Sequence, residues 1–479
     1  MLITLAAPAF AETWYIENGD ITVKASGTEG KNTVSQGNKK DVEDTNTIIT
    51  NQKTDTASSN TVTIEAGNDK VEVTLKDVNI DVSKQSKAAV SVTGSGNTTI
   101  KLDGDNHLTG GNGIYSNSRG SLTISGDEND SLTAQGGDSR NGIYSVSGDV
   151  TISGGTVTAT GGNSTSNYGS GGDGIHSGSL TISGGTVTAT GGGSTGSNGL
   201  GGRGIYSVSG DVTISGGTVN ANGGDGKDGS GGGIDSSGSV AISGGTVTAK
   251  GGSGEDGGDG IYSSSGVAIS GGAVNAAGGD GGNGKDGGDG IYSSDIDLSG
   301  SLELTAKAGS PNGKALSQRG NELDLNTIKD KLGPGAKVTT TDADGKVIKQ
   351  VSIPRPVEPE GPVIPEDSSS SSDGGSSAPS APVSSIPGLT VTDKSGAVIS
   401  YTSTQSGNTL TVCVGRFTAS LRASLAALRQ LRAEGIETIT FQTILCSTTL
   451  SVDELLAMGG EDAEAVLTHR STDSSLTVG

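Results

Sequence analysis

The chain is poor in the residues that build an ordinary globular core. Of its 479 residues, 30% are hydrophobic and 3% aromatic, with one Trp, three Phe and two Cys against 84 glycines. So little apolar material excludes a large conventional core, and the composition alone would fit disorder. The few apolar residues, however, alternate with polar ones in short regular runs, which indicates β-strands.

Positive charge and long apolar runs are also scarce. Lys and Arg number 31 against 53 Asp and Glu, so the net charge is −22. Nucleic-acid backbones and anionic membranes would repel such a chain, and no stretch is long enough to span a bilayer. We therefore expect no nucleic-acid partner and no membrane insertion. The acidic, Gly-, Ser- and Thr-rich composition is typical of a bacterial protein that is extracellular or displayed on the cell surface. We expect it to be a monomer.

The beginning of the chain resembles a signal peptide. Residues 1–11 (MLITLAAPAFA) are apolar and end in an A-x-A site, but they lack a basic start. We interpret them as a signal-peptide remnant that is cut before Glu12. The alternative is a short buried strand.

A repeat of nearly constant length organises the middle of the chain. A Gly-Ile pair opens each unit and places Ile at 114, 143, 175, 205, 234, 261 and 291. Each unit holds three short strands, such as GIYS, VTIS and TVTAT, joined by Gly-rich corners. Alternate residues in these strands are apolar, and a unit that cannot bury that face alone must stack on its neighbours. The pattern predicts an all-β fold, a parallel β-helix or solenoid with coils about 4.8 Å apart. A β-sandwich would not need fixed corner residues.

Composition divides the rest of the chain around this solenoid. We expect an N-terminal cap at 12–60 with one strand over 13–23, followed by the β-helix with ~30-residue repeats at 61–352. Trp14, inside that strand, is interpreted as a cap residue. Residues 353–388 are rich in Pro and Ser and predict a disordered linker.

Residues 389–479 change character and predict a small α/β module. We expect strands at 410–414, 438–445 and 464–469, and an amphipathic helix over 418–434. Ser451 and Glu454 form a capping box for a second short helix. The strand–helix–strand order predicts that the first two strands are parallel. Cys413 falls on the first of these strands and Cys446 directly follows the second, either as buried thiols or as a disulfide.

The outer surface carries the candidate binding residues. The residue after each Ile would form a column along the stack, which Asp235 interrupts. Polar-tipped aromatic rings in a row can stack on sugar rings and offer hydrogen-bond partners. The predicted carbohydrate-binding residues are Tyr115, Tyr144, His176, Tyr206, Tyr262 and Tyr292. The alternative is that these rings only cover the Gly-rich corner beside them.

Acidic residues beside this column predict calcium. Asp173, Asp259 and Asp289 stand two residues before an Ile, and the last two would lie on adjacent coils, where like charges are destabilising without a cation. The loops after the third strand add Asp228, Asp256 and Asp286 in GGxGxD segments. Oxygen ligands without His or Cys suit calcium. The alternatives are solvated acidic loops and, for Asp173, a neighbouring Arg203.

Catalysis has little support in the sequence. His107, His176 and His469 lie far apart, and no nucleophile or metal-binding spacing surrounds them. Arg203 is the one basic residue in the register of the Tyr and Asp columns, and one residue does not make a site. We therefore expect a protein that is not an enzyme.

The repeats resemble a known family. GNGIYSNSRGSLTISG, DGIHSGSLTISGGTVTA and GDGIYSSSGVAISGG are similar to the carbohydrate-binding β-helix family of clostridial and other gut bacterial surface proteins, which is related in fold to pectate lyases. The resemblance covers about residues 61–310. It implies a right-handed coil that binds cell-wall polysaccharide, including acidic pectin, with calcium and without lyase activity. It carries over only Asp173, Asp259 and Asp289 as metal ligands, and the long GGDGKDGG loops depart from it.

The sequence as a whole predicts an exported β-helix protein that binds cell-wall or dietary polysaccharide without cleaving it, with calcium bridging an acidic, pectin-like glycan. A structural adhesin or stalk on the bacterial surface is the alternative, and a polysaccharide lyase is the third possibility.

Overall fold

The computed structural model describes residues 12–28, 30–354, 388–393, 398–399, 401–406, 408–414, 418–443, 447–458, 463–470 and 473–478. The predicted signal-peptide remnant and all but the ends of the predicted linker lie outside these residues. The chain divides into two compact units, residues 1–359 and 360–479.

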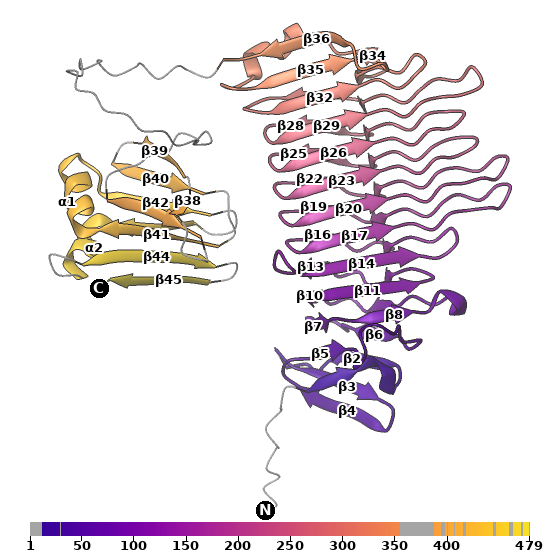
Figure 1. The fold of residues 1–479 in the computed structure, drawn as a ribbon, viewed down its shortest axis with the longest axis horizontal. Helices are drawn as coiled ribbons and strands as arrows, with labels where there is room; N and C mark the ends of the chain where they lie inside the picture. Colours follow the sequence, from indigo (N-terminus) through magenta and orange to yellow (C-terminus); the bar gives the residue numbers. More distant parts are fainter. Residues whose placement is uncertain are drawn as a thin grey trace, which may run out of the picture. The chain divides into compact units, whose positions relative to one another are not determined.

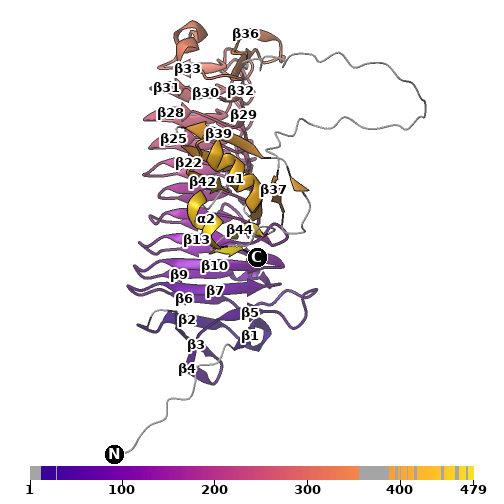
Figure 2. The same ribbon diagram turned by 90° about the vertical axis from the view of Figure 1, so that its left-hand side faces the viewer.

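The first unit is the predicted parallel β-solenoid, and its coil is right-handed (Figures 1 and 2). Each regular coil gives one short strand to each of three sheets, in the order B, A, C along the chain. Sheet A contains the VTIS-type strands, sheet B the GIYS-type strands and sheet C the TVTAT-type strands.

Sheet A has eleven parallel strands. They are β1 (Thr13–Tyr15), β5 (Ile48–Thr50), β7 (Val71–Lys76), β10 (Thr98–Asp103), β13 (Leu122–Ser125), β16 (Val150–Ile152), β19 (Leu180–Ile182), β22 (Val212–Ile214), β25 (Ser239–Ile242), β28 (Gly266–Ile269) and β31 (Ile296–Leu298).

Sheet B has a parallel body with an antiparallel addition at each end. The body is β2 (Ile21–Ala25), β6 (Val62–Glu65), β9 (Val90–Thr93), β12 (Ile114–Ser116), β15 (Ile143–Ser145), β18 (Ile175–Ser177), β21 (Ile205–Ser207), β24 (Ile234–Ser236), β27 (Ile261–Ser263), β30 (Ile291–Ser293) and β33 (Leu316–Gln318). The additions are β3 (Asn32–Gln36) and β4 (Lys39–Asp44) at one end and β34 (Asn321–Glu322) at the other.

Sheet C is parallel up to its last strand, which turns back antiparallel. Its strands are β8 (Asn79–Asp81), β11 (Asp105–Gly110), β14 (Ser131–Gly136), β17 (Thr156–Thr160), β20 (Thr186–Thr190), β23 (Thr218–Asn222), β26 (Thr246–Lys250), β29 (Ala273–Ala277), β32 (Glu303–Lys307), β35 (Lys337–Thr341) and β36 (Val347–Ser352). Short 3₁₀ helices accompany the sheets at η1 (Ile16–Asn18), η2 (Ser83–Gln85), η3 (Leu325–Thr327) and η4 (Lys329–Lys331).

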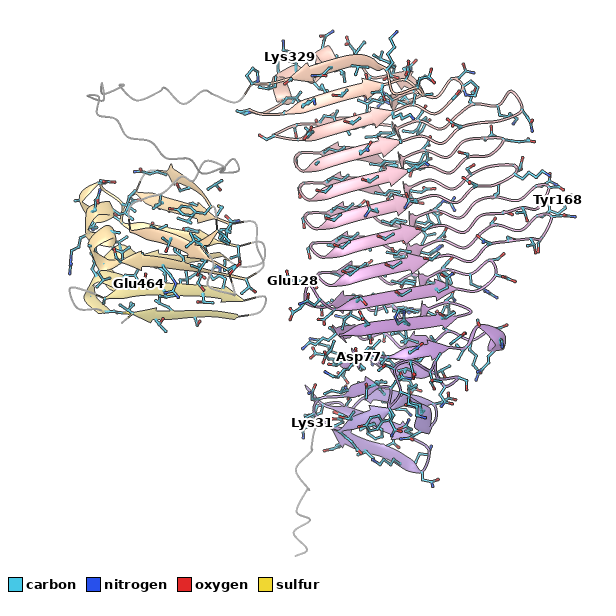
Figure 3. All side chains as sticks on the ribbon, in the orientation of Figure 1. Lys31, Asp77, Glu128, Tyr168, Lys329 and Glu464 are labelled. Carbon is cyan, nitrogen blue, oxygen red and sulfur yellow. The ribbon has the colours of Figure 1, made fainter. Side chains whose placement is uncertain are left out.

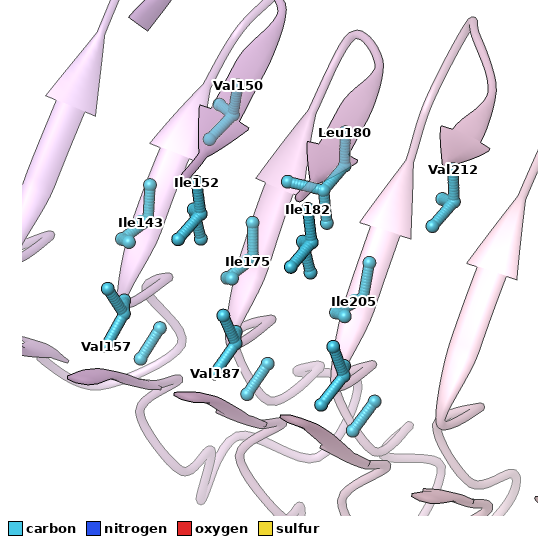
Figure 4. Packing of buried hydrophobic residues seen from close by; sticks show 14 of the residues in the cluster. Ile143, Val150, Ile152, Val157, Ile175, Leu180, Ile182, Val187, Ile205 and Val212 are labelled. Atoms are coloured by element: carbon cyan, nitrogen blue, oxygen red, sulfur yellow. The ribbon is translucent and has the colours of Figure 1, made fainter. Parts of the chain in front are cut away.

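Aliphatic ladders fill the inside of the coils, as the alternation predicted. In one coil the inner residues are Ile143, Val150, Ile152, Val157 and Ala159, and none is exposed to solvent. Each pairs in register with the equivalent residue of the next coil, so Ile lies on Ile and Val on Val or Leu (Figure 4). Burial of one such aliphatic side chain contributes about 1.5–3 kcal/mol, and repetition over the coils supplies the core that composition alone did not suggest.

Two small residues fix the corners of each coil. The second Gly of the SGG corner has a positive φ, 75° at Gly155, which a side chain with a Cβ rarely adopts. The last residue of each GIYS strand is a buried Ser, and its hydroxyl can donate to corner carbonyls, as Ser145 does to Gly148 O at 2.9 Å. The sequence pattern showed these serines but gave no sign of this role.

The Gly-rich loops all leave one edge of the solenoid and stack on each other (Figures 1 and 3). Backbone N–H groups of one loop donate to carbonyls of the loop below, for example Gly192 N to Gly172 O at 2.8 Å and Gly224 N to Gly202 O at 2.7 Å. Tyr168 lies at the tip of one loop and is 83% exposed. We call this stack of loops the fin.

The N-terminal end differs from the single strand predicted over 13–23. The segment forms β1, η1 and β2, because Gly19 leaves the extended backbone with a φ of 129° and the chain turns into the next sheet. Trp14 is buried, and its indole N–H donates to Asp44 Oδ2 at 2.8 Å, so it is a structural residue of this end, as expected.

The described residues of the second unit form two sheets and two helices. One sheet has the order β38 (Val398–Ile399), β37 (Leu389–Thr392), β41 (Ala419–Ser424), β44 (Glu464–Arg470) and β45 (Asp473–Val478), and the other has β39 (Thr402–Ser406), β40 (Thr409–Cys413), β42 (Thr438–Gln442) and β43 (Ser447–Ser451). The helices are α1 (Leu425–Ala433) and α2 (Val452–Met458). The predicted parallel pair is confirmed, since β40 and β42 are parallel.

The helix predicted over 418–434 is wrong in its first half, where β41 forms. Ala419, Leu421 and Ala423 alternate with outward residues and are buried, so the period of two decides the structure there. Helix α1 begins only after Ser424, whose hydroxyl accepts from the Ala427 N–H at 3.2 Å. Cys413 is a free thiol, and Cys446 lies outside the described residues.

Candidate glycan-binding column on sheet B

Sheet B brings the predicted aromatic residues into one column. Each three-residue strand points its first and last side chains inward and its middle side chain outward. The middle residues pair in register from coil to coil: Tyr115, Tyr144, His176, Tyr206, Asp235, Tyr262 and Tyr292. All are partly buried.

The first four rings of this aromatic column contact each other continuously. Ring centroids are 5.6 Å apart between Tyr115 and Tyr144, 4.7 Å between Tyr144 and His176, and 5.0 Å between His176 and Tyr206. The first pair is tilted by 51°, and the two His176 pairs are edge-to-face at 88° and 87°. In an edge-to-face pair one ring keeps both faces clear of its partner.

The last two rings are arranged differently. Tyr262 and Tyr292 are stacked, with centroids 5.6 Å apart and an angle of 7° between the planes. Each covers a face of the other, so this segment offers ring edges and hydroxyls. Burial raises the pKa of the Tyr262 phenol, and the nearby charges of Asp235 and Asp259 raise it further.

An ion pair separates the two aromatic segments. Arg203 Nε lies 2.5 Å from Asp235 Oδ2, and the Arg203 guanidinium lies 4.2 Å from the Tyr206 ring centroid. Burial raises the pKa of the Asp235 carboxyl, although the Arg203 charge opposes this shift. The sequence placed both residues in register but did not predict that they pair with each other rather than Arg203 with Asp173.

A second column, two residues before each Ile, forms a ladder of side-chain bonds to the backbone. We call it the Asx ladder. In each case a side-chain Oδ1 accepts the backbone N–H of the column member on the next coil. The bonds run from Asn141 N to Asn112 (2.9 Å), Asp173 N to Asn141 (2.7 Å), Arg203 N to Asp173 (2.8 Å), Asp289 N to Asp259 (2.6 Å) and Lys314 N to Asp289 (2.6 Å). The ladder breaks at Arg203 and Gly232, which have no acceptor oxygen in the side chain.

The six predicted calcium ligands do not form one cluster. Asp173, Asp259 and Asp289 belong to the Asx ladder, and Asp173 Oδ2 also lies 2.9 Å from His176 Nδ1. Asp228, Asp256 and Asp286 are exposed on the fin, where Lys285 Nζ lies 3.4 Å from Asp256. Among the described residues no group of three or more His, Cys, Asp or Glu could hold a metal ion. Calcium binding therefore stays a prediction, with Asp259 and Asp289 on adjacent coils as its nearest pair.

Asp259 has the most perturbed carboxyl of this region. Burial raises its pKa to about 7, and the neighbouring charges of Asp289 and Asp235 act in the same direction, while the backbone N–H of Asp289 opposes them. A carboxyl with this pKa is a weak calcium ligand near neutral pH, because the ion must displace its proton.

None of the helices in the described residues is long and apolar enough to cross a membrane.

Comparison with known proteins agrees with the coil structure. Four segments match the family model described as a β-helix repeat, residues 150–179, 180–202, 212–234 and 240–261. No curated protein and no solved structure matches the chain. The matched segments include His176, whereas Tyr206 and Asp235 lie just outside them. Together with the three-sheet topology, the match identifies the solenoid as a parallel β-helix built from β-helix repeats.

Proposed function

We propose that this protein is exported and binds polysaccharide along the aromatic column of sheet B without cleaving it. The observation that carries the proposal is the unbroken ring contact from Tyr115 to Tyr206 on the outer face of four successive coils. Sugar rings stack on aromatic faces, and a repeated row of such faces suits a repeated ligand.

The spacing of the column supports an extended glycan that runs along the solenoid axis. Successive coils lie about 4.8 Å apart. That distance is close to the length of one sugar residue in an extended polysaccharide, so consecutive sugars would meet consecutive rings. The rings of the first segment are tilted or edge-to-face and none is stacked on its neighbour, although the Arg203 guanidinium lies over Tyr206. The stacked Tyr262 and Tyr292 add hydroxyl groups farther along.

A structural stalk is the second candidate, and the Asx ladder favours it. Side chains that were expected to bind a ligand instead hold successive coils together, as Asp173 and Asp259 do. A rod needs such bonds whether or not it binds anything. Lyase activity is the third candidate, and Arg203, the basic residue in register with the two columns, is paired with Asp235.

The test compares two single substitutions in the full chain, both made on the same coil. Tyr144→Ala removes a ring from the aromatic column. Thr151→Ala, on β16 of sheet A, removes an outward side chain of another face. We expect wild-type protein to bind at least one polysaccharide on a glycan array, and Tyr144→Ala to lose about tenfold in affinity, since one aromatic contact contributes about 0.5–1.5 kcal/mol beyond its buried area. Circular dichroism checks that both variants are folded.

Four outcomes are informative. Equal losses in both variants would place the binding elsewhere, and no binding of any glycan would favour the stalk. Growth of unsaturated uronate absorbance with an acidic glycan would support the lyase. Binding that disappears with a chelator would support the predicted calcium.

A further inference from the structure

The charges beside the aromatic column indicate which glycans it accepts. Resting on the proposed function, we propose that the column selects by charge: it prefers glycans with free amino groups, binds the N-acetylated form less tightly and rejects uronic acids. The sequence-based expectation of an acidic, pectin-like glycan predicts the opposite order of preference.

Carboxylates outnumber cations on the two outer columns of sheet B. The acids are Asp173, Asp235, Asp259 and Asp289, and the bases are Arg203 and Lys314. The Arg203 charge is already neutralised by Asp235, and the Tyr206 ring covers one face of the guanidinium. Lys314 stands at the end of the Asx ladder, one coil beyond Asp289. A glycan along the middle of the column therefore meets net negative charge.

Three of these acids come from successive coils around the stacked tyrosines. Asp235 belongs to β24, Asp259 precedes β27 and Asp289 precedes β30, and Tyr262 and Tyr292 are the outward residues of β27 and β30. The strands β24, β27 and β30 pair in register, and Asp259 Oδ1 accepts the backbone N–H of Asp289 at 2.6 Å, so these carboxyls lie on neighbouring coils. A uronate would add another negative charge here, which is unfavourable in a partly buried setting.

Asp259 and Asp289 keep acceptor capacity for a ligand. In each carboxyl Oδ1 accepts a backbone N–H of the next coil, whereas Oδ2 has no hydrogen-bond partner among the described residues. An ammonium group donates up to three hydrogen bonds, and bonds between charged partners are roughly twice as strong as neutral ones. An N-acetyl group offers one neutral N–H at the same place. The same backbone should therefore bind more tightly when its amines are free.

The experiment titrates the full chain with three hexasaccharides in a calorimeter at near-neutral pH. They are the hexamers of glucosamine, N-acetylglucosamine and galacturonic acid, the last with and without calcium. We expect the glucosamine hexamer to bind at least tenfold more tightly than the N-acetylated hexamer, with a difference that shrinks at high salt. The galacturonate hexamer should not bind without calcium.

Variants test whether the charge beside the column is responsible. Asp289→Asn removes one charge and keeps Oδ1 as the acceptor for Lys314 N–H, so we expect the amine preference to fall several-fold. Asp228→Asn removes one charge from the exposed fin and controls for the net charge of −22. The charge selection would be overturned if the glucosamine and N-acetylglucosamine hexamers bound with equal affinity. It would also be overturned if both variants had the same effect, or if the galacturonate hexamer bound without calcium. If no glycan binds on the array either, the proposed function fails together with it; if other glycans bind and Tyr144→Ala weakens them, only the selection fails.

Discussion

At the scale of single residues, the Asx ladder is the main addition to what the repeat pattern indicated. Where the residue two positions before an Ile is Asn or Asp, its side chain accepts a backbone N–H of the next coil and so links the two coils. Asn and Asp offer the same Oδ1 acceptor, but Asp also brings a charge. At Asp259, where burial and the neighbouring acids Asp289 and Asp235 raise the pKa to about 7, that charge is costly.

We predict that Asp259→Asn removes a pH dependence of stability. The folded pKa of about 7 lies above the ordinary 3.8, so the folded protein holds a proton that the unfolded chain has already released between these pH values. Stability therefore falls as the pH rises from about 4 to about 7, by up to roughly 4 kcal/mol for a shift of about three pKa units. The Asn variant keeps the bond to Asp289 N–H and lacks this loss. It should match wild type at acidic pH and exceed it by a few kcal/mol above neutral pH.

Denaturant unfolding at a series of pH values without added metal checks this expectation. The exposed Asp228→Asn serves as the charge-matched control, and it should follow wild type. If the free energy of unfolding depends on pH in the same way for wild type and Asp259→Asn, the Asp259 carboxyl is ionised in the folded state throughout this range. A wild-type protein stabilised by calcium above neutral pH, with no such gain in Asp259→Asn, would instead support the predicted metal site.

The residues of the column were predictable, but their partners were not. The period of the Gly-Ile pairs placed Asp259 and Asp289 on adjacent coils, and the structure confirms that. From sequence, two stacked acids suggested a bridging cation. The side chain instead reaches along the stack to a backbone N–H, and a sequence does not show the direction in which a short side chain turns. Arg203 and Asp235 likewise form an ion pair between coils, and the sequence did not show that their side chains turn toward each other.

At the scale of elements, the fin depends on glycine for close approach between backbones. A Cβ built on Gly202 would lie 2.0 Å from Gly172 O, and a Cβ on Gly193 would lie 3.3 Å from its nearest atom, Asp225 O. Neither residue has a positive φ, so the two sites differ in space and not in backbone preference. The loops, for which the sequence left open calcium binding or simple solvation, are held by regular backbone hydrogen bonds from loop to loop.

We predict that Gly202→Ala disrupts the fin and Gly193→Ala does not. The methyl group that Gly202→Ala introduces would overlap a backbone carbonyl that is itself bonded, so several coils must shift, at a cost of about 1–3 kcal/mol. Hydrogen exchange measured by mass spectrometry should show faster exchange in residues 161–172, 191–203 and 223–232 for Gly202→Ala. Exchange unchanged from wild type would mean that the loops adapt without losing their bonds.

The sequence predicted strand or helix correctly where the hydrophobic residues follow a single period. The three strands of each coil follow an uninterrupted alternation, and all lie where expected. In the second unit, residues 419–424 fit both a period of two and the start of an amphipathic helix, and packing of Ala419, Leu421 and Ala423 against the second unit's core decides for a strand. Local pattern cannot settle such a segment, because the pairing partner β44 lies about forty residues away in the chain.

At the scale of the whole molecule, the solenoid must end without offering its open edges to other chains. Parallel stacking leaves an unpaired strand at each end of each sheet, and an exposed flat edge promotes association. Sheet C ends in β36, which reverses direction and pairs antiparallel with β35. Its outer side is exposed and includes Val347 and Ile348, at 52% and 53%, next to Lys349. Lysine on an edge strand discourages further pairing.

We predict that removal of β36 makes the protein self-associate. A chain ending at Thr341 would leave β35 as a flat parallel edge with free backbone groups, whereas a chain ending at Pro354 keeps the antiparallel strand. Both lack the second unit, so they differ in this strand and the turn before it. Sedimentation velocity over a range of concentrations should show larger species that grow with concentration only for the shorter chain. If both chains sediment as single species, the edge of β35 does not need its cover; if both associate, the cover is insufficient without the second unit.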